Sequence, residues 1–472
     1  MCRLEAVQPS ETRRWPRDPF NSLQVTPKSK TLKIYSKFLL KVIAGVTLLS
    51  FMIFLVNIRL DSGNQLDISP KNKSIDYDNY ANIRNPALVW YTSEVWWIPF
   101  NRKLVCSKNS KSVECEVFRQ ESEPDEVDAY LFYSGYIGRF PLPRRPETIW
   151  ALVHDETPLN RLPFMYEAGL NLFNFSATFS RFSDVPMPLI WSTGLYDITS
   201  PTFFLKTSVK NSLLGGIAPV IFMQSNCDTS TERDAYVREL GKHIRIDSYG
   251  MCLRNKELLL PKMYQYDESV VYMTHLYGEE ILKFLAKYKF IIAIENAVCN
   301  DYLTEKFWRS ITVGTVPIYF GSPLIRDWLP NNKSAILLED FPTPELLSQH
   351  LHYLLNNDTA YEEYLEHKTL GIITNQKLID KLFETPTELS DVVQRLECLV
   401  CEKLHTKSKA VNMVTKKHYD CPLPVSALSL SVNPKNKWLK LIDEAKEKVD
   451  GLYEEIRQLN RTRRKSKITW GW

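Results

Sequence analysis

Apolar and polar residues follow one another along the chain in blocks that predict alternating strands and helices. Between residues 207 and 380, short apolar runs are each followed by a stretch with helical spacing. The predicted strands are "APVIFM", "IRIDSYG", "YKFIIAIEN", "VPIYFG" and "AILLED", and the predicted helices are "TERDAYVRELGKH", "TEKFWRSIT" and "PELLSQHLHYLLNN". Apolar strands that alternate with helices are typical of a parallel sheet covered on both faces. We therefore expect a doubly wound α/β domain here.

Residues 87–206 predict a second domain in front of it. This segment contains the strand-like runs "ALVWYTSEVWWIPF", "EVDAYLFYS" and "ETIWALVHDET", separated by loops rich in Pro and Arg. Two such units in tandem would leave a cleft between them. Residues 381–433 form a further segment that contains cysteines.

The tail, residues 434–472, carries apolar residues at alternating steps of four and three. These are Trp438, Ile442, Ala445, Val449, Leu452, Ile456 and Leu459, and they are followed by Arg461, Arg463, Arg464, Lys465 and Lys467. The spacing predicts an amphipathic helix with a narrow apolar seam and a basic end. Two interpretations fit the seam: self-association through residues 434–460, or a helix folded back on its own domain.

The first 86 residues predict a membrane anchor. Residues 38–58 include the uncharged run "VIAGVTLLSFMIFLVNI" and are about as long as a membrane-crossing helix requires. Basic residues gather on the N-terminal side, in residues 1–37 and at Lys41, which keeps that side cytoplasmic. Residues 59–86 are polar and read as a stem. We therefore expect a single-pass type II protein whose bulk lies in a lumen.

The amino-acid composition is that of an ordinary globular protein and argues against one class of partner. Of the 472 residues, 44% are hydrophobic, 12% aromatic and 24% charged, as in a globular protein with substantial cores. The formal net charge is only +4, and no long basic stripe occurs in the body of the chain, which argues against nucleic acid as a partner.

Cysteines and glycosylation motifs agree with a lumenal address. Asn-x-Ser/Thr motifs lie at Asn72, Asn174, Asn332, Asn357 and Asn460. Cysteines beyond the predicted anchor are Cys106, Cys115, Cys227, Cys252, Cys299, Cys398, Cys401 and Cys421. We expect Cys106–Cys115 and a pairing among Cys398, Cys401 and Cys421. Zinc bound by Cys398 and Cys401 with His405 and His418 is an alternative, although the spacing misses the usual finger pattern.

The stretch "ENAVCNDYLTEKFWRSITVGTVPIYFG" carries the first candidate chemistry. Thr304 can cap a helix that begins at Glu305, which leaves the first backbone N–H groups free for an anion. Lys306 suits a diphosphate, and the carboxylate of Glu305 suits a pair of sugar hydroxyls. This reading predicts nucleotide-sugar recognition. The alternative is that both are solvated residues of a first helical turn.

Two further candidates follow predicted strands. Arg233, near the start of a helix, would fork onto phosphate oxygens, or it is a surface residue paired with Glu232 or Asp234. In "WALVHDETP", Asp155 and Glu156 end a strand after His154. If they are partly desolvated, their repulsion would raise the proton affinity of one towards that of a general base. Otherwise they are ordinary solvated acids in a turn.

Several well-known motifs are missing from the sequence. It has no G-x-G-x-x-G, no Walker loop and no H-E-x-x-H, and its one Asp-x-Asp, Asp76 to Asp78, falls in the predicted stem. A metal-assisted nucleotide-sugar site needs such a pair inside the fold. We therefore expect protein cations to take the place of a metal, with no other cofactor.

These residues resemble the GDP-fucose-dependent alpha-1,3-fucosyltransferases, glycosyltransferase family 10. "YKFIIAIENAVCNDYLTEKFWRSITVGTVPIYFGSP" resembles the donor-site signature of that family almost throughout, including an acidic-Asn pair at Glu295-Asn296. "SNCDTSTERDAYVREL" and "IDSYG" resemble the preceding donor segment. "HDETP" resembles the Glu-Ser-Pro of the acceptor side, with Thr157 in place of Ser. The resemblance covers about Ala87 to Leu370.

The resemblance implies a GT-B fold, with an acceptor domain (87–206) and a GDP-fucose-binding domain (207–380) facing each other across a cleft. It implies that Glu156 is the catalytic base and that Arg233 and Lys306 hold the diphosphate. Asn296, Tyr302 and Glu305 match positions at the nucleotide, ribose or fucose. The implied reaction inverts the anomeric centre of GDP-fucose without a metal.

The chain departs from the Lewis-antigen branch in its heptad tail, its arginine-rich N-terminus and its acceptor-side loops. It looks closest to the divergent animal branch numbered 10 and 11, whose members are also called protein O-fucosyltransferases 3 and 4. That resemblance implies Ser or Thr of folded secretory domains, such as EMI domains, as the acceptor. The resemblance does not decide whether the protein is located in the endoplasmic reticulum or in the Golgi. The alternatives are alpha-1,3-fucosylation of N-acetylglucosamine in N-glycans, and an idle lumenal binding or chaperone-like protein.

Overall fold

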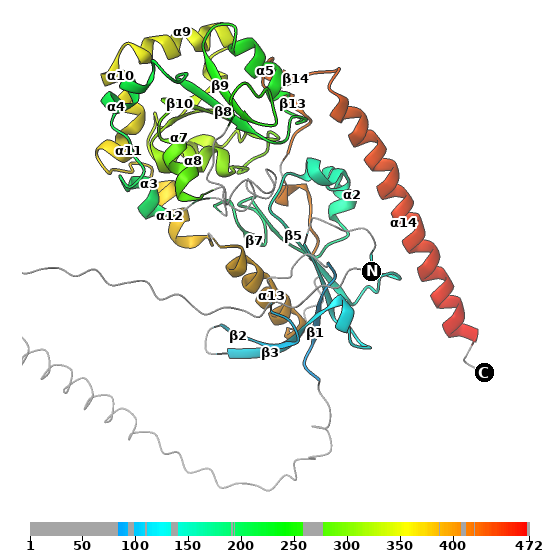
Figure 1. Cartoon of the computed structure of the whole chain (residues 1–472). Coiled ribbons are helices and arrows are strands. Elements are labelled where there is room, and N and C mark those ends of the chain that lie inside the picture. The colour runs from blue at the N-terminus through cyan, green and yellow to red at the C-terminus, as the bar shows by residue number, and fades with distance from the viewer. Residues whose placement is uncertain are drawn as a thin grey trace, which may run out of the picture. The chain divides into compact units, whose positions relative to one another are not determined.

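The computed structural model describes residues 84–92, 99–108, 111–133, 140–189, 192, 194–257, 277–386, 388–406, 412–419 and 421–469 (Figure 1). All of these residues belong to one compact unit, Ile83–Trp472. The predicted tail (1–37), the predicted anchor (38–58) and most of the predicted stem lie outside the described residues, as do Asn72 and Asp76 to Asp78. Within the described part, no helix has both the length and the apolar character needed to cross a bilayer.

The N-terminal part of this unit is built on a seven-stranded sheet. Its strands are β1 (Ala87–Trp90), β2 (Arg102–Lys108), β3 (Lys111–Arg119), β4 (Ala129–Tyr133), β5 (Ile149–His154), β6 (Phe175–Thr178) and β7 (Val185–Pro186), in the order β2-β3-β1-β4-β5-β6-β7. All neighbours pair in parallel except β2 and β3, which form an antiparallel hairpin at the edge. The predicted strands at β1, β4 and β5 are confirmed. The hairpin was not predicted.

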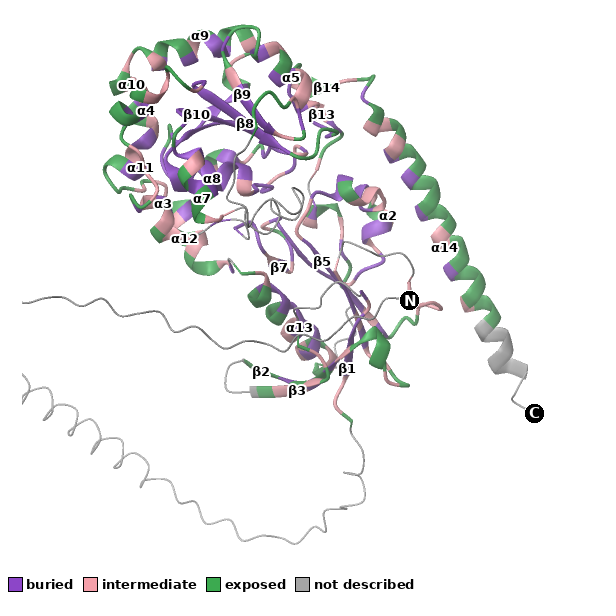
Figure 2. Ribbon diagram, viewed as in Figure 1, coloured by how far each residue is buried: buried purple, intermediate pink, exposed green. Residues whose placement is uncertain are grey.

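Helices from distant parts of the chain cover both faces of this sheet. One face packs against α13 (Leu389–His405), whose Val392, Leu396 and Val400 are fully buried (Figure 2). The other face packs against the short helices η4 (Pro158–Met165) and α2 (Glu167–Leu170) and against the long C-terminal helix α14 (Lys437–Thr469). The C-terminal region therefore completes the core of the N-terminal sheet.

A five-stranded parallel sheet forms the second half. Its strands are β8 (Val220–Gln224), β9 (Ile246–Gly250), β10 (Phe290–Ile294), β11 (Val316–Phe320) and β12 (Ile336–Leu337), in the order β12-β11-β10-β8-β9. The direction of winding reverses between β8 and β10. In open α/β sheets, ligands bind outside the carboxyl ends of the strands at this kind of reversal. The predicted doubly wound parallel sheet is confirmed.

Helices pack on both faces of the second sheet (Figure 1). α5 (Arg233–Leu240) and α9 (Pro344–Leu355) lie on one face, and α7 (Glu279–Leu285) and α8 (Glu305–Val313) lie on the other. Further α-helices among the described residues are α3 (Leu195–Thr199), α4 (Thr207–Leu213), α10 (Asp358–Glu362), α11 (Glu366–Thr369) and α12 (Gln376–Glu384). A small hairpin joins β13 (Val425–Ser426) to β14 (Ser431–Val432). Helices on both faces bury the apolar side chains of these strands, whose exposure to water would be unfavourable in free energy.

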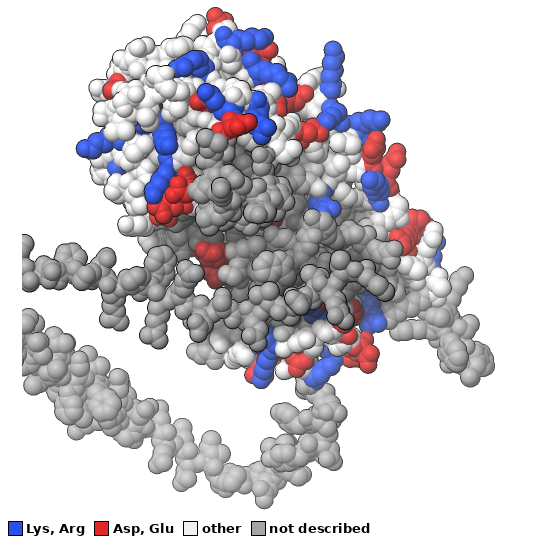
Figure 3. Space-filling view, in the orientation of Figure 1, with Lys and Arg blue, Asp and Glu red and all other residues white. Residues whose placement is uncertain are grey.

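The apolar seam of the tail lies against its own domain. Ile442, Ala445, Val449 and Ile456 of α14 are buried, and Ile442 and Ile456 belong to the core shared with η4 and α2. Of the two interpretations, the fold-back is therefore the one observed. Lys and Arg are interspersed with Asp and Glu along the outer side of this helix (Figure 3).

The expected disulfide pairing is wrong. The observed pairs are Cys106–Cys398, Cys115–Cys401, Cys227–Cys252 and Cys299–Cys421. In the β2–β3 hairpin Cys106 lies opposite Val113 and Cys115 lies opposite Leu104, so the two cysteines are diagonal neighbours. Both pack against α13, which presents Cys398 and Cys401 one helical turn apart. The zinc alternative is wrong as well, because disulfide formation removes the thiolates that it requires.

Candidate active site

The start of α8 is a capped helix terminus at the carboxyl edge of the second sheet. The Oγ1 of Thr304 accepts a hydrogen bond from the backbone N–H of Lys306 at 3.4 Å, as predicted for a cap. The ammonium group of Lys306 also donates to Thr304 Oγ1, at 2.8 Å, and to Glu305 Oε1, at 3.1 Å. Only 6% of the Lys306 side chain and 15% of the Glu305 side chain is exposed, so the alternative of two solvated residues is wrong.

A fully buried carboxylate, Glu295, completes this group. Its oxygens accept hydrogen bonds from the backbone N–H and the hydroxyl of Thr304, each at 2.7 Å, and Oε2 lies 3.4 Å from Lys306 Nζ. Burial raises the pKa of Glu295. Burial would also raise the pKa of Glu305, but the charges of Lys306 and Arg309 lower it to about 2. Glu305 is therefore the ionised acceptor at this edge, and it can accept hydrogen bonds from hydroxyl groups.

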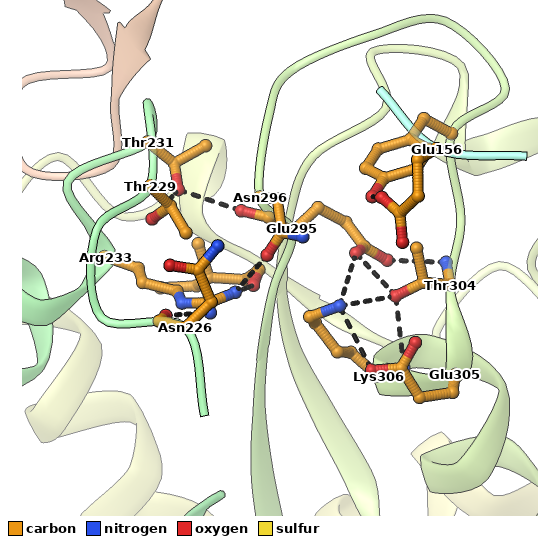
Figure 4. Close-up of polar contacts among 12 residues, drawn as sticks. Glu156, Asn226, Thr229, Thr231, Arg233, Glu295, Asn296, Thr304, Glu305 and Lys306 are labelled. Carbon is orange, nitrogen blue, oxygen red and sulfur yellow. Dashed lines mark hydrogen bonds and ion pairs between the residues drawn. The ribbon is translucent and has the colours of Figure 1, made fainter. Parts of the chain in front are cut away.

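Arg233 lies at the first residue of α5, where the winding reverses between β8 and β10. Its Nη1 donates to the carbonyl of Ile294 at 3.1 Å and to Asn296 Oδ1 at 2.8 Å, and its Nη2 donates to the carbonyl of Asn226 at 2.5 Å (Figure 4). Only 1% of Arg233 is exposed, which contradicts the surface interpretation. These three hydrogen bonds fix the position of the guanidinium group. Its Nε has no hydrogen-bond partner.

The carboxylate of Glu156 comes from the other sheet, two residues after β5. The hydroxyl of Tyr302 donates to its Oε2 at 2.6 Å, and the amide of Asn160 donates to the same oxygen at 3.3 Å. Figure 4 shows the Glu156 side chain extending towards the group formed by Glu295, Thr304 and Lys306. The structure thus brings together residues separated by about 150 positions in the sequence.

The environment of Glu156 gives it the properties of a base. Burial raises its pKa to about 7, although the charge of Lys306 and the hydrogen bond from Tyr302 each lower it in part. Burial also raises the pKa of Asp155, whose carboxylate accepts a 2.9 Å hydrogen bond from the hydroxyl of Tyr133. The alternative of ordinary solvated acids is therefore wrong for this turn. A carboxyl group with a pKa near neutrality is well matched to proton transfer at physiological pH.

All six predicted site residues lie at the carboxyl ends of the strands. Hydrogen bonds join Tyr302 to Glu156 and Lys306 to Glu305, and the charge of Lys306 acts on Glu156. Arg233 and Asn296 form a further hydrogen-bonded pair on the other side of Glu295. Tyr302 contacts the predicted base directly.

Two charged residues were missing from the predicted site. Glu295, expected only as part of a family motif, holds both Thr304 and Lys306. Arg309, one helical turn after Glu305, is 5% exposed, donates from Nε to the carbonyl of Glu305 at 3.2 Å and has no partner at Nη1. The helical spacing of four between Glu305 and Arg309 was the available signal for the second of these.

The arrangement places one proton acceptor and several fixed cations around one region. The carboxylate comes from the first sheet, and the cations come from the carboxyl edge of the second. Such a site can take a proton from a nucleophile on one side and stabilise a departing anion on the other.

Comparisons with known proteins point to one family. Residues 84–190 match the family model "Fucosyltransferase, N-terminal", and residues 217–418 match "Glycosyltransferase family 10 (fucosyltransferase) C-term". The chain is 40% identical over 367 residues to alpha-(1,3)-fucosyltransferase B of Drosophila melanogaster, covering 74% of this chain and 79% of the relative. It is 35% identical over 385 residues to GDP-fucose protein O-fucosyltransferase 3 of Homo sapiens, covering 77% and 79%.

Among solved structures, a crystal structure of an alpha1,3-fucosyltransferase with GDP aligns over 70% of this chain and 94% of its own, at 16% identity and a TM-score of 0.39. The two family models together span most of the described residues, and the curated relatives exceed 30% identity over more than two thirds of the chain. The chain belongs to glycosyltransferase family 10, the fucosyltransferases.

Proposed function

We propose that the protein transfers L-fucose from GDP-beta-L-fucose to Ser or Thr of folded secretory domains, such as EMI domains, with inversion at the anomeric carbon. The observation that carries the reaction is the contact between Tyr302 and Glu156, because it brings a partly desolvated carboxylate to the edge that holds Lys306. This arrangement supports a GT-B enzyme whose two domains face each other across a cleft.

Each site residue has a role in this proposal. Glu156 accepts the proton of the acceptor hydroxyl as its oxygen attacks C1 of fucose. The bond from C1 to the β-phosphate oxygen breaks, and its electron pair leaves with GDP. Lys306 and Arg233 stabilise the charge on the departing diphosphate. Glu305, Asn296 and Tyr302 contact the ribose, the nucleotide or the fucose.

The acceptor is inferred from the relatives. Several that are 34–36% identical are named GDP-fucose protein O-fucosyltransferase 3, which supports a protein hydroxyl. The 40% identical relative named alpha-(1,3)-fucosyltransferase B favours a second candidate, fucosylation of N-acetylglucosamine in N-glycans. Incubation with GDP-fucose and folded EMI domains or N-glycan acceptors distinguishes the two, with mass spectrometry locating the fucose on Ser/Thr or on the sugar. If the folded protein binds GDP-fucose but transfers fucose to neither acceptor, a binding protein without catalytic activity is the better interpretation.

We further propose a type II membrane protein of the endoplasmic reticulum or Golgi, anchored by residues 38–58, with its catalytic part in the lumen. The four disulfides support this address, because they persist in oxidising compartments. The experiment is protease protection in sealed microsomes from cells that express the full chain. Digestion of residues 84–469 without detergent contradicts this topology.

The protein cations also support a reaction without a divalent metal. Lys306 and Arg233 supply fixed positive charge at the edge where the diphosphate would lie. We therefore expect transfer to be unchanged in EDTA, measured as GDP released in the presence of acceptor. A reversible loss of activity that added Mg²⁺ or Mn²⁺ restores would overturn this part of the proposal.

A further inference from the structure

The turn after β6 is held by its own hydroxyl groups. The Oγ of Ser183 accepts from the backbone N–H of Thr178 at 2.9 Å and donates to the carbonyl of Ser176, also at 2.9 Å. The backbone N–H of Ser180 donates to the hydroxyl of Thr178 at 3.2 Å. Because these groups are buried, the turn presents the next residue, Arg181, from a fixed backbone.

Arg181 reaches from this turn to a buried carboxylate of the second half, Asp301. Its Nε lies 3.0 and 2.9 Å from the two carboxylate oxygens, its Nη2 donates to Oδ1 at 2.6 Å, and its backbone N–H donates to Oδ2 at 3.0 Å. Its Nη1 donates to Asp327 at 2.8 Å. Such a fork fixes the direction of both partners as well as their distance.

Asp301 is restrained from every side. It is fully buried, and its φ of 63° is in the left-handed region that Asp tolerates better than most residues. The indole N–H of Trp328 donates to Oδ1 at 3.1 Å, and the backbone N–H of Asp301 donates to the hydroxyl of Ser322 at 2.9 Å. With Arg181 in place, its backbone conformation is therefore set by the surrounding contacts.

The next residue is Tyr302, whose hydroxyl donates to Glu156 at 2.6 Å. The ring of Phe179, two residues before Arg181, packs on the ring of Tyr302 with centroids 5.0 Å apart. β5 and β6 are adjacent parallel strands, so Glu156 and the turn that carries Phe179 and Arg181 leave the same edge of the sheet. Residues that follow two neighbouring strands, β5 and β6, thus contact the consecutive residues Asp301 and Tyr302.

We propose that Arg181 is a positioning residue for catalysis: its guanidinium holds Asp301 and thereby keeps the hydroxyl of Tyr302 on the carboxylate of Glu156. This inference rests on the proposed function, because it takes Glu156 as the base. Arg181 itself does not touch the reacting atoms.

The consequence is a specific change in pH dependence. The titratable groups that face Glu156 are Asp155 on its own turn, Tyr419 from the segment after α13, and Tyr302, Glu305 and Lys306 from the second half. Of these, Tyr302 lowers the pKa of Glu156 through its hydrogen bond. If Arg181 no longer holds Asp301, this hydrogen bond is lost more often and the pKa of Glu156 rises. The base then loses its proton only at higher pH.

The experiment compares Arg181→Lys with Tyr302→Phe in the full chain. A lysine cannot make the fork, but it preserves the charge near buried Asp301, which protects the fold. We expect both variants to move the acid limb of kcat/KM to higher pH by about half a unit to one unit, a three- to tenfold loss below that limb. The GDP affinity of Arg181→Lys, measured by calorimetry, should stay within about twofold of wild type, because Arg181 is not among the residues proposed to contact the donor.

Two further measurements separate positioning from a merely structural role. In the double variant, the acid limb should lie where Tyr302→Phe alone puts it, because Arg181 acts through Tyr302. The control is Arg326→Ala, which removes a 60% exposed cation of the neighbouring turn η6 (Ile325–Asp327) that pairs with Glu339 and Asp340. It should leave the limb in place. Two results would overturn the proposal. One is an acid limb of kcat/KM that does not move in Arg181→Lys. The other is a double variant in which the pH shifts of the two single variants add.

A measurement that does not require fucose transfer separates the test of Arg181 from the test of the proposed function. The carboxyl band of Glu156, identified in infrared titrations by its loss in Glu156→Gln, should titrate at higher pH in Arg181→Lys. If the wild type transfers no fucose but this shift occurs, the function fails and the positioning role stands. If the wild type transfers fucose and the band does not move, only the positioning role fails.

Discussion

At the scale of single residues, the site depends on how burial and neighbouring charge act on a few ionisable groups. Glu156 and Glu305 are both carboxylates close to Lys306, but burial raises the pKa of the first to about 7 while Lys306 and Arg309 lower that of the second to about 2. The two can therefore take different roles at neutral pH. One can accept a proton and the other is an ionised hydrogen-bond acceptor.

This difference predicts the pH dependence of activity. Glu156 acts only when it is deprotonated, so kcat/KM should fall about tenfold per pH unit below about pH 7 and level off above it. Glu156→Gln should lower kcat by at least about a hundredfold, because an amide cannot accept the proton. Steady-state rates from pH 5 to 9 and GDP calorimetry measure both effects. A Gln variant with normal turnover, or with no GDP binding, would contradict this role.

The fork of Arg233 gives a second prediction at this scale. Lysine keeps the charge but cannot reach the carbonyls of Asn226 and Ile294 and the side chain of Asn296 together. We expect Arg233→Lys to weaken GDP binding about ten- to a hundredfold by calorimetry, since hydrogen bonds to a charged group contribute about 1.5–3 kcal/mol each. Arg238→Lys, an exposed position on the same helix, is the matched control and should bind normally. Equal affinities for the two variants would exclude Arg233 from the donor site.

Sequence patterns predicted several of these residues but not their partners. Thr304, Glu305 and Lys306 were predicted as a helix start, because a cap and its first turn are neighbours in the chain. The pairing of Arg181 with Asp301 joins residues 120 positions apart and leaves no local trace. Glu295 was noted only as part of a family motif, and nothing beside it in the sequence indicates that it contacts Lys306.

At the scale of elements, the carboxyl ends of β10 and β11 determine the shape of the site. Gly321 follows β11, and a Cβ on this residue would lie 2.6 Å from Glu295 Cγ and 2.7 Å from the hydroxyl of Tyr319. A side chain here would therefore push Glu295 away from Thr304 and Lys306. Glycine is needed at this position for space, because its φ is not in the left-handed region.

Gly321→Ala should therefore weaken GDP binding and lower the free energy of unfolding by about 1–3 kcal/mol, as overpacking usually does. Gly451→Ala in α14 is the matched control, because nothing lies within 4 Å of the added Cβ. We expect that change to be neutral or slightly stabilising, since alanine favours helix. Thermal unfolding with and without GDP measures both. A stable Gly321→Ala protein with wild-type GDP affinity would show that Glu295 need not stay in place.

Elements with strong local periodicity were predicted well. The strands β8 to β11 and helices α5, α8 and α9 lie where the pattern placed them, because apolar runs and caps are properties of adjacent residues. The β2–β3 hairpin was missed. Its inward positions, such as Leu104, Cys115 and Val117, have charged neighbours in the sequence, and β2 as a whole reads "RKLVCSK".

At the scale of the whole molecule, two disulfides and one buried ion pair attach α13 to the first sheet. Cys398 and Cys401 of this helix pair with Cys106 and Cys115 of the β2–β3 hairpin. Immediately before Cys398 on α13, fully buried Glu397 accepts a 2.9 Å hydrogen bond from the indole N–H of Trp90 and pairs with Arg102. The polypeptide thus closes on itself across almost 300 residues.

These links predict the response to removal of a disulfide. Cys106→Ser/Cys398→Ser should lower the free energy of unfolding by about 2–5 kcal/mol, because a large loop of the unfolded chain is no longer closed. Denaturant unfolding of the wild type and the double variant measures this loss. Mass spectrometry of an unreduced digest should find peptides 106 and 398 linked in the wild type. A linked Cys106–Cys115 peptide would contradict the observed pairing.

The sequence by itself determined the α/β class, the second, parallel sheet and the capped start of α8. Each of these depends on interactions between residues close in the chain, which leave periodic patterns and short motifs. Only the tertiary structure decided the disulfide partners, the return of α14 to its own domain and the contact of Tyr302 with Glu156. These depend on which distant surfaces meet when the sheets close, because many pairings of distant surfaces are compatible with the same local pattern.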